Sequence, residues 1–155
     1  MVCFKGQHGI ELLIIFSTAL AVFIIFYALF AQQYSEGAQR QAKSDAISIA
    51  DRIAGEINIA ARAGNGYERK FEYPRKIPGA TGYNISINNA SGSVDVLMIL
   101  GDGNVFEHTS PTLTRNITGE AIYATTSGYY LEMERGYAYV ENRNGVIAIT
   151  QMRVG

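Results

Sequence analysis

Residues 12 to 31 read LLIIFSTALAVFIIFYALFA, and this stretch decides the fold. It contains no charged residue, no glycine and no proline, and its only polar side chains are Ser17, Thr18 and the Tyr27 hydroxyl. A helix of about 20 residues is about 30 Å long, which matches the hydrocarbon core of a bilayer. The stretch therefore predicts one membrane-spanning helix near the N-terminus.

Two other interpretations of this stretch are a buried core helix and a cleaved secretory signal. A core helix needs apolar partners, and the 155 residues contain no second stretch of similar hydropathy. A secretory signal has a shorter apolar region that ends in small residues, whereas residues 30–33 read FAQQ. We therefore expect the segment to be retained, with Lys5 on the cytoplasmic side and the bulk of the chain outside.

Composition sets broad limits on the class of protein. A chain of 155 residues suits one compact domain with an appendage. Its 13 basic and 14 acidic residues give a net charge of −1, and no basic stripe indicates a nucleic-acid partner. The single cysteine, Cys3, excludes an intramolecular disulfide.

The chain begins MVCFKGQHGIELLII, so a short basic leader stands directly before the apolar run and Glu11 stands at its start. This beginning resembles the class III signal peptide of archaeal type IV pilin-like proteins. Lys5, Gly6, Gln7 and Glu11 match the family motif, whereas Gly9 replaces a frequent serine and Ile15 a common leucine. The resemblance covers about the first 35 residues.

The resemblance implies how the chain is processed and assembled. A prepilin peptidase would remove residues 1–6 by cutting between Gly6 and Gln7, where glycine leaves the extended backbone unhindered. The carboxylate of Glu11 would then pair with the new amine of Gln7 on an adjacent subunit. Two alternatives stay open: Glu11 is a solvated interfacial residue, or Gln7 cyclises and loses its amine.

Residues 32–63 continue the helical pattern beyond the membrane segment. Apolar residues recur at spacings of three and four, and Gly64-Asn65-Gly66 ends the pattern. A row of small residues, which would permit close helix approach, consists of Ala38, Ala42, Ala46, Ala50 and Ala54. We expect a stem over residues 7–63, about 85 Å long if unbroken. A coiled coil, or a stem that packs on its own head, is the alternative.

From Tyr67 onward the apolar period changes from 3.6 to 2. Alternation over residues 84–88, 94–100, 129–134 and 146–154 predicts strands, separated by turn signals at 89–92, 101–104, 127–128 and 142–145. We expect residues 64–155 to form an antiparallel sheet or sandwich of six to eight strands. The predicted fold class is α+β, a long N-terminal helix followed by this extracellular head.

Three sequons for N-glycosylation lie in the expected head, at Asn84, Asn89 and Asn116. Asn84 falls on the polar side of its strand and Asn89 in a turn, so both should be accessible. Coincidence in a polar β-domain is the alternative for any single site.

No set of residues indicates catalysis, a cofactor or a metal ion. His8 and His108 lack a paired ligand spacing. Asp95 and Asp102 stand near turns, where isolated acids are usually solvated. We expect a protein that is not an enzyme.

These observations favour a pilin, a subunit that polymerises with itself through its N-terminal helix into a cell-surface filament used for adhesion. Its precursor would reside in the cytoplasmic membrane. The alternatives are a minor pilin at the filament tip and a signal-anchored surface receptor or adhesin that never polymerises.

Overall fold

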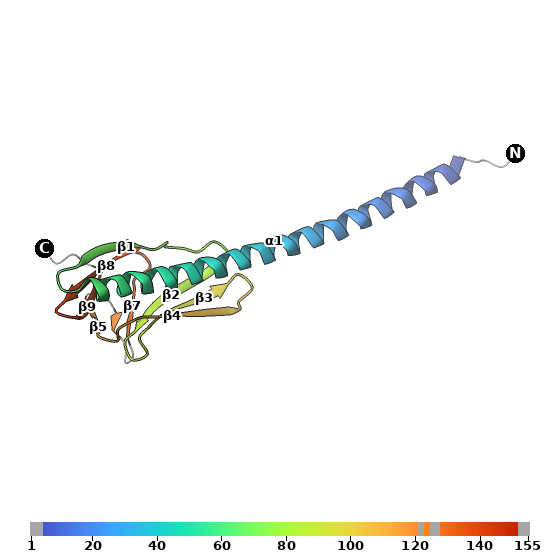
Figure 1. Cartoon of the computed structure of the whole chain (residues 1–155). Coiled ribbons are helices and arrows are strands. Elements are labelled where there is room, and N and C mark those ends of the chain that lie inside the picture. Colours follow the sequence, from blue (N-terminus) through green and yellow to red (C-terminus); the bar gives the residue numbers. More distant parts are fainter. Residues whose placement is uncertain (1–4, 121–122, 125–127, 152–155) are drawn as a thin grey trace. The chain divides into compact units, whose positions relative to one another are not determined.

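The computed structural model describes residues 5–120, 123–124 and 128–151, and it confirms the predicted α+β fold class. One helix, α1 (Lys5–Ala63), precedes all the strands, as Figure 1 shows. The strands are β1 (Glu68–Glu72), β2 (Ala80–Asn88), β3 (Ser93–Leu100), β4 (Val105–Pro111), β5 (Ile117–Glu120), β6 (Tyr123–Ala124), β7 (Gly128–Tyr130), β8 (Tyr137–Arg143) and β9 (Val146–Thr150).

Helix α1 ends where the glycines at 64 and 66 predict. Gly64 and Gly66 have φ values of 84° and 86°. Residues that carry a Cβ atom rarely adopt this left-handed backbone conformation. The Gly64 N–H donates to the Ala60 carbonyl at 3.4 Å, and Arg62 stands in the last turn, where a cation complements the helix dipole.

Contacts divide the chain into two compact units, one ending at Ala38 and the other covering Gln39–Gly155. The second half of α1 thus belongs to the same unit as the strands. This arrangement matches the alternative stated above, in which the stem packs on its own head. The small residues Ala42, Ala46 and Ala50 are fully buried there and Ala54 is 3% exposed. For these four alanines the expected role in helix–helix approach is therefore wrong, because they are buried in the core of the head. Ala38, the first of the row, is half-buried.

The strands form two sheets, with orders β1-β8-β9-β5 and β4-β3-β2-β7-β6. All neighbouring strands are antiparallel except β5 and β9, which pair in parallel from Ile117↔Ile147 to Glu120↔Thr150. The expected head was antiparallel with six to eight strands, whereas the described residues form nine strands that include one parallel pair. The parallel pair arises because β5 approaches β9 after a connection that crosses from the other sheet, a relation that no local pattern encodes.

The turns at 89–92, 101–104 and 142–145 join the strands as predicted. Asn144 and Gly145 have φ values of 54° and 86°, the positive pair that a two-residue hairpin requires. Two strand predictions are too long. The strand predicted over 129–134 ends at Tyr130, and the one predicted over 146–154 ends at Thr150, with residues 152–154 outside the described part.

One core joins both sheets to the second half of α1. In Figure 1 the strands lie alongside this part of the helix. The helix contributes Ala42, Ala46, Ala50 and Ala54 together with Ile49, Ile53 and Ile57. The five-stranded sheet contributes Ile85, Ile87, Val94, Val96, Met98 and Leu100. The four-stranded sheet contributes Phe71, Ala138, Val140, Ile147 and Ile149.

Shortening a core side chain on α1 is expected to destabilise the head. Ile53 is 1% exposed, so Ile53→Ala should lower the free energy of unfolding by about 2–5 kcal/mol through lost burial and a cavity. Ile47, six residues earlier on the same helix, is 36% exposed and provides the control, because Ile47→Ala removes less buried area and opens its gap to solvent. Thermal unfolding of the full chain in detergent, followed by circular dichroism, measures both. Equal shifts would contradict the packing of α1 against the sheets.

Candidate functional site

The first half of α1 is the most unusual surface of the chain. Every residue from Gly9 to Gly37 is exposed. The large apolar side chains range from 47% exposed at Val22 to 83% at Tyr34. The mean hydropathy of this part reaches 2.7, and by length and composition it can cross a membrane. Such a surface needs lipid or other protein to cover it, so this helix is compatible with membrane anchoring.

Two polar side chains within this segment, Ser17 and Thr18, are satisfied by the helix itself. The Ser17 hydroxyl donates to the Leu13 carbonyl at 2.7 Å, and the Thr18 hydroxyl donates to the Ile14 carbonyl at 2.8 Å. Hydrocarbon offers no hydrogen-bonding partner, so internal satisfaction is a requirement for a helix in lipid. Both hydroxyls meet it.

The residues predicted for cleavage and assembly lie at the start of α1. The side chains of Lys5 and Gln7 lie outside the described part, but the backbone is helical from Lys5 and includes Gly6. A peptidase that cuts extended backbone would therefore have to unwind the first turn, which glycine at position 6 makes easier. Glu11 is exposed on the same helix.

The three sequons lie in different surroundings. Asn84 is half-buried in β2 and pairs in register with Leu97 of β3. Asn89 is half-buried in the turn after β2. Asn116 is exposed, and its Nδ2 donates to the Gly145 carbonyl at 3.1 Å. Glycosylation of at least one of them stays a prediction.

His108 of β4 lies in a polar cluster with Asp51 of α1 and Ser110. Its Nε2 is 3.6 Å from Asp51 Oδ1 and 3.4 Å from Ser110 Oγ, and the Ser110 hydroxyl donates to Asp51. A hydrolytic triad places the acid on one ring nitrogen and the nucleophile on the other. Both groups face Nε2 here, so the cluster connects α1 to β4 rather than activating Ser110.

Asp95 and Asp102, the two acids that stand near turns, have separate hydrogen-bonding partners. Asp95 accepts from the Ser93 hydroxyl at 3.0 Å on β3. Asp102 accepts from the Asn104 backbone N–H at 2.9 Å in the β3–β4 turn, and this bond lowers its pKa. It also accepts from Gln39 Nε2 at 3.0 Å. Within the described residues, no group of three or more His, Cys, Asp or Glu side chains could hold a metal ion.

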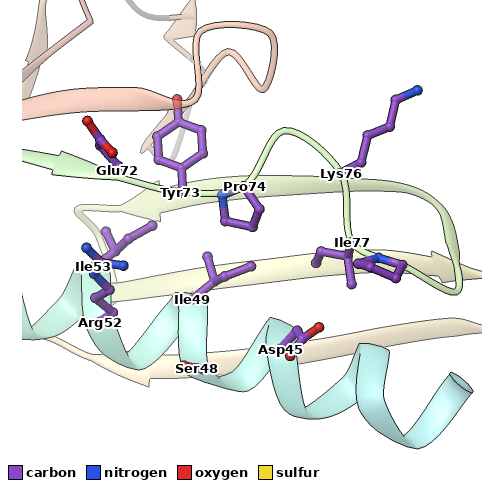
Figure 2. A pocket seen from close by; sticks show the side chains of 11 residues that line it. Asp45, Ser48, Ile49, Arg52, Ile53, Glu72, Tyr73, Pro74, Lys76 and Ile77 are labelled. Atoms are coloured by element: carbon purple, nitrogen blue, oxygen red, sulfur yellow. The ribbon is translucent and has the colours of Figure 1, made fainter. Parts of the chain in front are cut away.

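A groove of about 230 Å³ runs between α1 and the β1–β2 connection (Figure 2). Apolar Ile49 and Ile77 lie along its floor, and charged Asp45, Arg52 and Lys76 stand at its rim. In Figure 2, Ile77 points toward α1 and Lys76 points away from it. Charges of both signs around a small open groove indicate no particular ligand.

Asn142 is a structural residue that sequence reasoning assigned only to a turn. It is 2% exposed, its Nδ2 donates to the Ala60 carbonyl at 2.9 Å, and its Oδ1 accepts from the Gly145 N–H at 2.9 Å. The last carbonyls of a helix lack partners within the helix. The Ala60 carbonyl accepts only a long bond from the Gly64 N–H, and Asn142 adds a shorter one that fixes the end of α1 to the β8–β9 hairpin.

A second buried network surrounds Gln151, which is fully buried. Its Oε1 accepts from the Glu132 N–H at 2.7 Å, and its Nε2 donates to the Tyr73 hydroxyl and to the Glu132 carbonyl. Burial raises the pKa of Tyr73 and raises the pKa of Tyr83 to about 12. The Tyr83 hydroxyl donates to the Pro74 carbonyl.

The raised pKa values of these tyrosines predict that the head loses stability at alkaline pH. Above the ordinary value of 10.0, the unfolded chain loses the Tyr83 proton while the folded chain keeps it up to about pH 12. The unfolded state then binds fewer protons, so the free energy of unfolding falls as pH rises. Urea unfolding between pH 9 and pH 12 measures the slope. Tyr83→Phe should flatten the slope, whereas phenylalanine at the exposed Tyr34 should leave it unchanged.

Comparisons with known proteins give this chain no relative. No family model, no curated protein and no solved structure matches it. The site must therefore be interpreted from its own chemistry, and its main feature is the exposed apolar half of α1 directly after Lys5, Gly6 and Gln7.

Proposed function

We propose that this chain is a structural subunit of a cell-surface filament, a pilin that is anchored in the cytoplasmic membrane before assembly. The observation that carries the proposal is the completely exposed apolar surface from Gly9 to Gly37, which a globular head does not need. A helix that leaves the bilayer must exchange lipid for other apolar surface. Neighbouring copies of the same helix supply such a surface.

The leader supports a filament over a permanent anchor. Lys5, Gly6 and Gln7 resemble the motif at which a prepilin peptidase cuts on the cytoplasmic side, which leaves the apolar helix intact. The resemblance extends to archaeal adhesion pilins. A surface receptor that never polymerises has no use for this cut.

The head suits exposure to the outside. The second half of α1 is packed into the core of the head, where Ile53, Ile57 and Asn142 fix it to the sheets. A pulling force on the stem is therefore transmitted to a helix that the sheets hold in place. Glycans on Asn89 or Asn116 would cover turns and loops of this head.

Mass spectrometry of sheared surface filaments tests the proposal. The expected chain starts at Gln7, because the cut after Gly6 removes the leader alone. A chain that starts at Met1, or after Ala31, would refute the pilin assignment. A chain that keeps Met1, stays in the membrane and never enters filaments would favour the surface-receptor alternative.

A further inference from the structure

Strand β3 is apolar on both faces of the five-stranded sheet. Val94, Val96 and Met98 are fully buried against the core, yet Leu97 and Ile99 on the opposite face are each 42% exposed. Antiparallel strands with one face in water normally alternate apolar and polar residues. The outer side of β3 therefore departs from the pattern that its place in the fold requires.

Neighbouring strands extend this apolar patch and add acids to it. Ile99 pairs in register with Val105 of β4, which is 63% exposed, and Leu97 pairs with Glu107. Asp95 stands two residues before Leu97, so it shares the same face. We define the acidic-apolar face by these five residues: Asp95, Leu97, Ile99, Val105 and Glu107.

A surface of opposite charge lies in the connection between β1 and β2. We define the basic loop as residues 74–78, which read PRKIP. Arg75 and Lys76 are exposed, and neither forms an ion pair with a carboxylate in the described part of the chain. Figure 2 shows Lys76 pointing away from α1.

The basic loop is held in shape without a partner. Ile77 is 3% exposed and anchors its centre, and the Tyr83 hydroxyl donates to the Pro74 carbonyl. Pro74 and Pro78 restrict the backbone at both ends. A loop ordered before it binds loses little conformational freedom on docking.

We propose that the basic loop of one copy docks on the acidic-apolar face of the next copy in the filament. The inference rests on the proposed function. Arg75 and Lys76 complement Asp95 and Glu107, while the exposed rings of Pro74 and Pro78 cover Leu97, Ile99 and Val105. Each copy carries both surfaces, so a head-to-tail contact, in which each loop meets the face of the next copy, is heterologous and can repeat along a helical polymer.

Charge reversal in full-length subunits tests this contact. Three filament types are compared: Lys76→Glu, Glu107→Lys and the double variant that carries both changes. The measured quantity is the fraction of subunit that still sediments as filament after mild heating at low salt. Each single variant should lower this fraction about threefold or more, because opposite charges become like charges at an exposed contact. The double variant should recover to within about twofold of wild type, since it restores an opposite pair.

Glu68→Lys is the matched control, because Glu68 is an exposed acid on β1 of the other sheet and undergoes the same charge change. It should leave the filament fraction unchanged. Raising the salt concentration should weaken wild-type filaments and shrink the difference between them and the single variants.

Several outcomes would overturn the contact. It is rejected if the single variants behave like Glu68→Lys, or if the double variant is no better than the weaker single variant. A glycan on Asn84 also rejects it, because Asn84 pairs with Leu97 and the sugar would occupy this face. If wild-type chains form no filaments, the proposed function fails with the contact; filaments that ignore charge reversal reject the contact alone.

Discussion

Glu11→Gln subunits are expected to insert into the membrane and to be cleaved normally. Their incorporation into filaments should fall at least about tenfold below that of wild-type subunits. Glu11 stands at the edge of the uncharged run, where the membrane precursor can keep its carboxylate at the wet interface. In packed helices the carboxylate needs a cation, and in the proposed filament the free amine of Gln7 on a neighbour would supply one. Losing such a desolvated pair exceeds the ~1.4 kcal/mol that a factor of ten represents.

Gly6→Val separates processing from assembly in the same experiment. A β-branched residue at the cut should block cleavage, so uncleaved precursor should accumulate in the membrane. Immunoblots of membrane and sheared-filament fractions compare the two variants. Normal incorporation of Glu11→Gln would show that Glu11 is only an interfacial residue, and would leave the filament assignment on the cleavage motif and the apolar helix.

Gly128→Ala is expected to lower the free energy of unfolding of the head by more than about 2 kcal/mol. Gly128 of β7 pairs with Asn88 of β2. A Cβ at Gly128 would clash with the Ile87 carbonyl oxygen and lie 2.9 Å from Asn88 Cα. These are backbone atoms within a sheet, so relief requires β7 to move away from β2.

Gly82→Ala provides the control for this substitution. Gly82 lies on β2 itself, and a Cβ there has nothing within 4 Å. Alanine at Gly82 should change stability by less than about 0.5 kcal/mol, because it adds a methyl group to an open position. Thermal unfolding of both variants measures the difference. Equal stability would contradict the close approach of β7 and β2.

The sequence alone located the helix end, the hairpin turns and the inward faces of β2 and β3. Each depends on local signals: the glycines at 64 and 66, the Asn144-Gly145 pair, and alternation over a few residues. The same locality made two strand predictions too long. Leu131 continues the alternation and is 3% exposed, but its N–H donates to the Ile85 carbonyl after β7 has ended.

The candidate site divides in the same way. The apolar run, Lys5, Gly6, Gln7 and Glu11 are contiguous, so the sequence was enough to identify an anchor and a proposed cleavage site. The acidic-apolar face could not be found in this way, because pairing between β3 and β4 brings Ile99 and Val105 together. Burial of the opposite side of β3 then determines that Leu97 remains outside.

Hydropathy and periodicity were enough to predict one long helix whose first half is apolar, followed by a β-rich head. Both signals depend only on residues that are close together in the sequence. Only the tertiary structure decided what the alanine row touches. Ala42, Ala46 and Ala50 suit a second helix and a sheet equally well, because small side chains permit close approach to either. The two sheets of the chain's own head cover them, and residues 9–37 remain the apolar surface open to lipid or to other copies.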